Sequence, residues 1–183
     1  MADTPYDNMD TLVKDVFIAL TKLPTKPCVF FGHSMGARVA YELTLMLVRH
    51  RFTLPLHVIA SASSAPCVPR KKPPIYALPD DEFIAEVAGL NGSSEEVLAD
   101  REIMELLMPT LRADFKIVET YLNKSEYVLP TTVSVFSGKE DDLEDHEIEP
   151  WLRLFASNTG IHWIEGDHFF VDKNRDGTLK MLT

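Results

Sequence analysis

Residues 30–43 read FFGHSMGARVAYEL, and this stretch decides the fold. It contains the pattern Gly-x-Ser-x-Gly, centred on Ser34. A short apolar run at 28–31 precedes the pattern, and apolar residues at helical spacing follow it to about residue 49. A strand, a sharp turn and a helix are the setting in which this pattern forms a nucleophile elbow, which raises a serine above the edge of a sheet. The sequence therefore predicts Ser34 as a nucleophile, in an elbow that includes Gly32, His33 and Gly36.

The glycines of the elbow have an expected purpose. Without side chains, Gly32 and Gly36 should let the strand turn into the helix without clashes. His33 stands next to the serine and is expected to point away from it.

Alternating signals along the rest of the chain predict an α/β fold with a mostly parallel sheet. From the apolar patterns, strands are expected at 28–31, 56–60, 132–136 and 161–164, and helices at 10–23, 36–49 and around 147–157. The segment from 73 to about 122 carries no strand signal. Its helical patterns begin at Asp80, at a Ser93-x-x-Glu96 capping box, and at 101–108 and 109–122. These are either helices over the sheet or a helical insertion that forms a lid.

The composition excludes several classes of function. The chain has 183 residues, 45% of them hydrophobic, and a formal net charge of -10, which disfavours a nucleic-acid partner. No apolar run is long enough for a membrane span, and the acidic, polar start MADTPYDNMD is unlike a secretory signal, so a cytoplasmic location is expected. The two cysteines form no metal-binding spacing, so no metal site is expected.

A serine nucleophile needs a base, and on this type of fold the chain order is serine, acid, histidine. His168 follows the last expected strand in Gly-Asp-His-Phe-Phe, where a loop can reach the elbow, so we predict it as the base. His146, in an acidic loop, is the reserve candidate. The acid should follow the third strand, where spacing alone does not choose among Glu140, Asp141, Asp142 and Glu144.

Several stretches together resemble the type II thioesterases, the free-standing α/β-hydrolases that accompany polyketide and nonribosomal-peptide synthases, with the medium-chain fatty-acid-synthase thioesterase as a close relative. The stretches are GHSMGARVAYEL, VIASASSAP, LPDDEF, TLRADFKIVETY, SGKED and GDHFF. The resemblance implies one α/β-hydrolase domain over 1–183, with a helical lid at 73–130. It places the family's acid on Asp141. The proline that often follows this acid is replaced by Asp142, which stays the alternative.

The resemblance also implies a chemistry. Ser34 would attack an acyl thioester on the phosphopantetheine arm of an acyl or peptidyl carrier protein, and His168 would act as base. The Met35 backbone N–H would be one oxyanion donor, and no metal or cofactor would be needed. The alternatives are a general esterase of the same fold and a truncated, non-catalytic homologue that binds carrier proteins.

The chain departs from the family before the elbow. The family begins with further strands and a glycine-containing loop that supplies the second oxyanion donor. In this sequence only the helix at 10–23 precedes the elbow. The sequence is therefore expected to be part of a longer protein, with a shortened homologue of weak or absent activity as the alternative.

Overall fold

The computed structural model describes residues 4–90 and 100–182. The chain divides into two compact units. We call residues 13–69 with 122–183 the sheet unit, and residues 1–12 with 70–121 the helical unit. The helix α1 (Met9–Thr21) runs from one into the other.

The sheet unit contains four strands, all parallel, in the spatial order β1-β2-β3-β4. They are β1 (Val29–His33), β2 (His57–Ser61), β3 (Leu129–Gly138) and β4 (Phe155–Ile164). The register places His33 beside Ser61, Ser61 beside Phe136, and Phe136 beside His162. Because the strands are parallel, their carboxyl ends lie along one edge of the sheet, which is where α/β proteins carry their sites.

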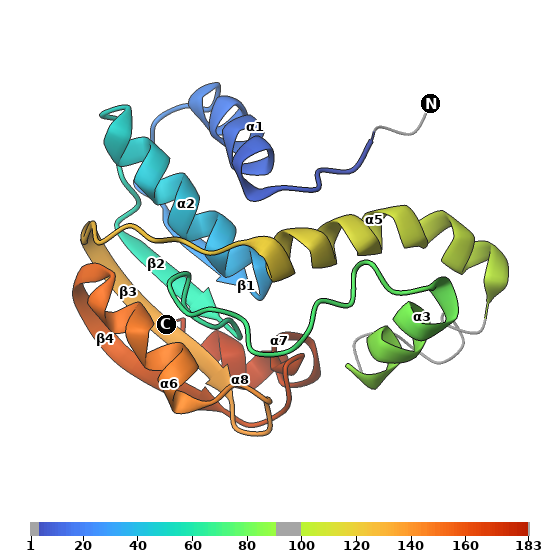
Figure 1. The fold of residues 1–183 in the computed structure, drawn as a ribbon. Coiled ribbons are helices and arrows are strands. Elements are labelled where there is room, and N and C mark those ends of the chain that lie inside the picture. The colour runs from blue at the N-terminus through green and yellow to red at the C-terminus, as the bar shows by residue number, and fades with distance from the viewer. Residues whose placement is uncertain (1–3, 91–99, 183) are drawn as a thin grey trace. The chain divides into compact units, whose positions relative to one another are not determined.

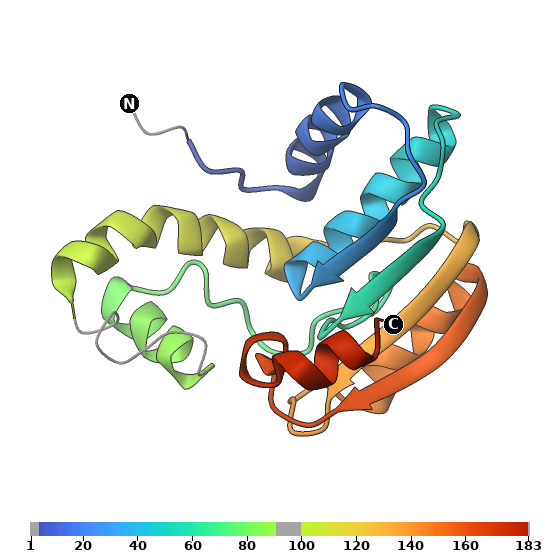
Figure 2. The ribbon, with the colours of Figure 1, turned by 180° about the vertical axis from the view of Figure 1, so that it is seen from behind.

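Helices cover both faces of this sheet (Figures 1 and 2). On one face, α2 (Met35–Arg49), α6 (Asp145–Ile148) and the 3₁₀ helix η1 (Glu149–Arg153) pack on Val58, Ala60, Val133 and Val135. On the other face, α7 (Phe170–Lys173) packs on Ile59, Phe136 and Ile164, and α8 (Arg175–Lys180) follows it. Neighbouring residues of β2 thus face opposite layers, as the two-residue period of a strand requires.

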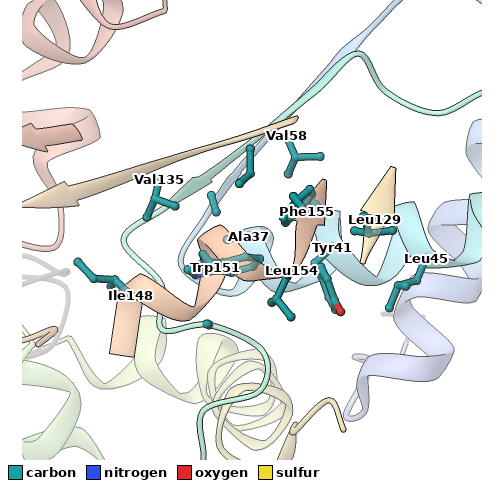
Figure 3. Packing of buried hydrophobic residues seen from close by; sticks show 14 residues of the cluster. Ala37, Tyr41, Leu45, Val58, Leu129, Val135, Ile148, Trp151, Leu154 and Phe155 are labelled. Atoms are coloured by element: carbon teal, nitrogen blue, oxygen red, sulfur yellow. The ribbon is translucent and has the colours of Figure 1, made fainter. Parts of the chain in front are cut away.

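The larger core cluster is centred on aromatic side chains (Figure 3). Trp151 and Tyr41 are fully buried, with their rings edge to face at 5.9 Å and 81°. Trp151 Nε1–H donates a 2.8 Å hydrogen bond to the carbonyl oxygen of Ser63, in the loop after β2. The bond satisfies the polar atom of a buried tryptophan and ties η1 to the carboxyl edge of the sheet.

The α/β class and the parallel sheet predicted from the sequence are confirmed, and all four expected strands are present. The expected helix around 147–157 is wrong in its second half. Helical structure ends at Arg153, and Phe155 already pairs with Leu129 in the sheet. Pairing with β3 outweighs the helical spacing of Trp151, Leu154 and Phe155.

In the helical unit, α3 (Asp80–Gly89) begins at the expected Asp80, and α5 (Arg101–Thr120) is one helix where two patterns were expected. Pro109 lies inside it. Proline removes one backbone bond and kinks a helix, but the apolar stripe continues on both sides of it, and the Asp100 side chain caps the start. The expected capping box at Ser93 to Glu96 lies outside the described residues.

A buried carboxylate organises the helical unit. The Glu119 side chain is fully buried, and Arg70 Nη2 lies 2.9 Å from its Oε1. The backbone N–H groups of Ile75 and Tyr76 donate to Glu119 Oε2 at 2.9 and 3.0 Å. A buried charge is tolerated when it is paired and hydrogen-bonded in this way. Glu119 therefore fixes the segment after Arg70 onto the end of α5.

Candidate active site

Ser34 lies at the turn between β1 and α2, with φ 53° and ψ -118°. This is a conformation that residues with side chains rarely adopt, and it stores backbone strain of about 1–3 kcal/mol. The Ser34 N–H donates to the carbonyl oxygen of Ser61 at 2.8 Å, which holds the turn to the end of β2. The turn therefore has the strand–turn–helix geometry that the sequence pattern predicts.

The two glycines of the elbow differ in their effect. A Cβ on Gly32 would lie 2.2 Å from the carbonyl oxygen of Gly36 and 2.6 Å from Ala37 Cα, so only glycine fits where β1 passes the first turn of α2. A Cβ on Gly36 would meet no described atom within 4 Å other than those of its chain neighbours and the backbone of its own helix. The expectation that both glycines avoid clashes is thus correct for Gly32 and wrong for Gly36.

The predicted base and acid lie together at the same edge of the sheet. His168 Nδ1–H donates to Asp141 Oδ2 at 3.0 Å. The Asp141 side chain is buried, with 4% exposed, while His168 is 32% exposed. A carboxylate on Nδ1 fixes the tautomer that leaves Nε2 as the proton acceptor. The pair has the geometry of a general base held by its acid.

The loops after β3 and β4 are joined by backbone hydrogen bonds, which bring Asp141 to His168. Lys139 N–H donates to the Ile164 carbonyl at 2.9 Å, and Glu140 N–H donates to the Gly166 carbonyl at 3.1 Å. A Cβ on Gly138 would lie 2.5 Å from the Gly166 carbonyl oxygen. The two loops therefore lie so close together that residue 138, at the end of β3, must be glycine.

The His168 loop is also held from its other side. The Asp167 carboxylate accepts hydrogen bonds from the Phe169 N–H at 3.0 Å and from Lys173 Nζ at 2.5 Å. The bond from Lys173 is the main reason why the pKa of Asp167 is lowered. Asp167 therefore holds the His168 loop in place through Phe169 and Lys173 and does not bind the reacting groups.

The structure also places the alternative acid, the reserve base and the predicted oxyanion donor. Asp142 is exposed, and it is Asp141 whose carboxylate binds His168. The reserve base His146 is half-exposed, with Nδ1 3.1 Å from Glu144 Oε2. The predicted oxyanion donor, the backbone N–H of Met35, belongs to the first residue of α2. At that helix end the backbone dipoles favour a negative charge.

Ser34 Oγ and His168 are not joined by a hydrogen bond in this structure. His33, which directly precedes Ser34 in the chain, packs against His168, and the centroids of the two rings lie 5.3 Å apart. His33 Nδ1 forms a 3.0 Å hydrogen bond with Ser61 Oγ. Catalytic hydrogen bonds are often long without substrate and shorten when it binds, so the arrangement is compatible with a Ser–His–Asp triad.

Sequence reasoning placed His33 in the elbow but missed the contact of its ring with His168, and it missed Ser61 altogether. Burial, and then the charge of His168, lower the pKa of His33, so this imidazole is neutral near pH 7. Strand alternation could have indicated its direction, because His33 must face away from α2 if Gly32 faces it. The pairing of Ser61 with His33 depends on the register of β1 and β2, which no local pattern gives.

The described residues hold neither a metal-binding group of side chains nor a helix suited to crossing a membrane. In residues 4–90 and 100–182, no three or more His, Cys, Asp or Glu side chains are grouped to hold a metal ion. None of the helices in that part of the chain has the length and apolar content that crossing a membrane requires.

Comparisons with known proteins identify the family of the chain. The model of the thioesterase domain family matches residues 2–183. The gramicidin S biosynthesis protein GrsT of Aneurinibacillus migulanus is 33% identical over 182 residues, which are 99% of this chain and 71% of that protein. The medium-chain S-acyl fatty acid synthase thioesterase of Rattus norvegicus is 28% identical, over 92% of this chain and 66% of that protein.

A solved structure shares the architecture. The type II thioesterase BorB from the borrelidin biosynthetic cluster superposes with a TM-score of 0.87 at 28% identity, covering 98% of this chain and 74% of that one. The family model spans nearly the whole sequence, and the relatives cover 92% to 99% of it. The chain therefore belongs to the thioesterase family and is a thioester hydrolase.

Proposed function

We propose that the chain hydrolyses acyl thioesters on the phosphopantetheine arm of acyl or peptidyl carrier proteins, with Ser34, His168 and Asp141 as its triad. The observation that carries the proposal is the 3.0 Å bond from His168 Nδ1–H to Asp141 Oδ2 at the sheet edge that also holds Ser34. The relatives from gramicidin S biosynthesis and fatty acid synthesis support the substrate class. A cytoplasmic location belongs to the same proposal.

The first half of the reaction forms an acyl-enzyme. His168 Nε2 takes the proton of the Ser34 hydroxyl while Oγ attacks the thioester carbonyl carbon. The negative charge moves to the carbonyl oxygen, where the Met35 N–H donates to it. The C–S bond then breaks, and the imidazolium of His168 gives its proton to the departing thiolate.

The second half releases the acid. His168 takes a proton from water, and the resulting hydroxide attacks the acyl-serine carbonyl. When the tetrahedral intermediate collapses, the proton returns to Ser34 Oγ. Asp141 stabilises the imidazolium in both halves without accepting its proton. The products are the carboxylic acid and the free thiol of the arm.

We further propose that residues 73–130, most of which belong to the helical unit, serve as a lid over the acyl chain. Its helix α5 carries exposed apolar side chains at Ile103, Leu106 and Leu107. The Glu119 contacts hold Arg70 and Ile75 against the end of this helix. Exposed apolar side chains on a helix suit an acyl group, because the transfer of apolar surface out of water is favourable.

Hydrolysis assays with matched substrates test the proposed function. The purified chain is given an acyl-phosphopantetheinyl carrier protein, and the p-nitrophenyl ester of the same acid in parallel. We expect release of the free thiol from the carrier at a higher kcat/KM than ester hydrolysis, and labelling of Ser34 by a fluorophosphonate. Ester hydrolysis alone would identify a general esterase. Carrier binding without turnover or labelling would identify a non-catalytic homologue.

Replacing Gly138 by alanine should damage the site from a distance. The new Cβ would lie 2.5 Å from the Gly166 carbonyl oxygen, so the loop that carries His168 must move. Overpacking of this kind costs about 1–3 kcal/mol of stability, and a displaced base lowers kcat by up to about 100-fold. Thermal unfolding and thioester assays measure both effects. Gly89→Ala is the control, since a Cβ there meets nothing within 4 Å, and equal effects of the two changes would contradict the prediction.

A further inference from the structure

His33 is a buried imidazole at the candidate site that the proposed reaction does not use. It is the last residue of β1 and directly precedes Ser34. Its side chain contacts residues of β2, of the loop after β4 and of α7. These contacts all lie within the sheet unit.

Ser61 fixes the position of the His33 ring. Its hydroxyl forms the 3.0 Å hydrogen bond with His33 Nδ1. Its carbonyl oxygen accepts the 2.8 Å bond from the Ser34 N–H. Ser61 is completely buried, so one rigid residue of β2 sets both the nucleophile backbone and the His33 ring.

The His33 ring in turn contacts the predicted base. Its centroid lies 5.3 Å from that of His168, with the planes inclined at 58°. Phe170, which is fully buried, meets His33 edge to face at 5.6 Å. The bond to Asp141 fixes one atom of the His168 imidazole, but the χ2 torsion of histidine has a broad minimum. A second ring against it limits that rotation.

We propose that His33 is a positioning residue, whose ring, held by Ser61, packs on His168 and keeps its Nε2 directed at Ser34. The inference rests on the proposed function, since it assigns His33 a part in that same reaction. His33 exchanges no proton with substrate. Its ring holds the His168 ring in a fixed position relative to the elbow.

The charge state of His33 agrees with this role. Burial lowers its pKa most, and the charge of His168 lowers it further. The main chain of His168 and the carboxylates of Asp141 and Asp172 act in the opposite direction. The net pKa is below the ordinary value of 6.5, so His33 is neutral near pH 7 and does not repel the imidazolium that forms on His168.

The test separates the ring contact from the hydrogen bond. His33→Asn keeps a polar group near Ser61 but removes the ring, and should lower kcat by about 10- to 100-fold with KM unchanged within about twofold. His33→Phe keeps a ring against His168 and should retain kcat within about threefold, rescuing what asparagine loses. The carrier-bound acyl thioester is the substrate, and thermal unfolding monitors the fold.

His57→Asn is the matched control, because His57 Nε2 also bonds a buried strand serine, Ser134, at 2.6 Å, but at the start of β2. Its kcat should be unchanged. Wild-type kcat in His33→Asn, or equal losses in His33→Asn and His33→Phe, would overturn the inference while the proposed function stands. If the wild-type chain does not hydrolyse the substrate, both the inference and the proposed function are wrong. If His33→Asn does not fold, His33→Leu takes its place.

Discussion

Replacing Ser34 by alanine is expected to lower kcat for thioester hydrolysis by about 10⁶-fold, the effect of removing the nucleophile of a Ser–His–Asp triad. The reason is that the acyl-enzyme cannot form without Oγ, and water must attack the thioester directly. Stopped assays of thiol release on the carrier-bound substrate measure the loss. Fluorophosphonate labelling of the variant should disappear with it. A loss below about tenfold would show that Ser34 is a serine in a structural turn.

Ser34→Gly separates catalysis from stability at the same position. It should be as inactive as the alanine variant. Its free energy of unfolding should be about 1 kcal/mol higher than that of the alanine variant, because glycine adopts a positive φ without steric cost. Denaturant unfolding of the two variants measures the difference. Equal stability would mean that the elbow is held without strain.

Replacing Asp141 by asparagine should lower kcat by about 10⁴-fold, with little change in KM. An amide NH₂ facing Nδ1 favours the tautomer with the proton on Nε2, so His168 can no longer accept the proton of Ser34. The fold should be retained, because asparagine has the size of the aspartate it replaces. Steady-state kinetics measure kcat and KM, and thermal unfolding checks that the fold is retained.

Asp142→Asn is the matched comparison, one position further along the same loop. Its side chain is exposed, and His168 bonds to Asp141. We expect its kcat to stay within about threefold of the wild type, as is usual for an exposed position outside a catalytic pair. The reverse ranking of the two variants would assign the acid to Asp142.

Much of this site could be predicted because its signals are local. The elbow needs a strand, a glycine without room for a side chain, and a helix, and residues 28–43 provide all three in sequence. His168 was predictable from chain order. Asp141 was not, since four acids follow β3; its selection came from the resemblance to a family, and its bond to His168 agrees with that choice.

The parts that could not be predicted depend on contacts distant in sequence. The second half of the expected helix at 147–157 has helical spacing, yet Phe155 enters the sheet because β3 offers it a partner at Leu129. The first half of β4 carries Ser157, Asn158 and Thr159, whose polar side chains give no strand signal. The ring contact between His33 and His168 joins the end of β1 to the loop after β4, and these two strands are not neighbours in the sheet.

The insertion of the helical unit between β2 and β3 has an evolutionary consequence. His57 and Thr132 are register partners although the segment 70–121 separates them. The entropy of closing a loop rises only with the logarithm of its length, about 0.6 kcal/mol for each doubling. The segment can therefore lengthen, shorten or diverge with little loss of stability in the sheet. In the proposed lid role of this segment, insertions and deletions there would change substrate preference while the strand pairing, and with it the geometry of Ser34, Asp141 and His168, is retained.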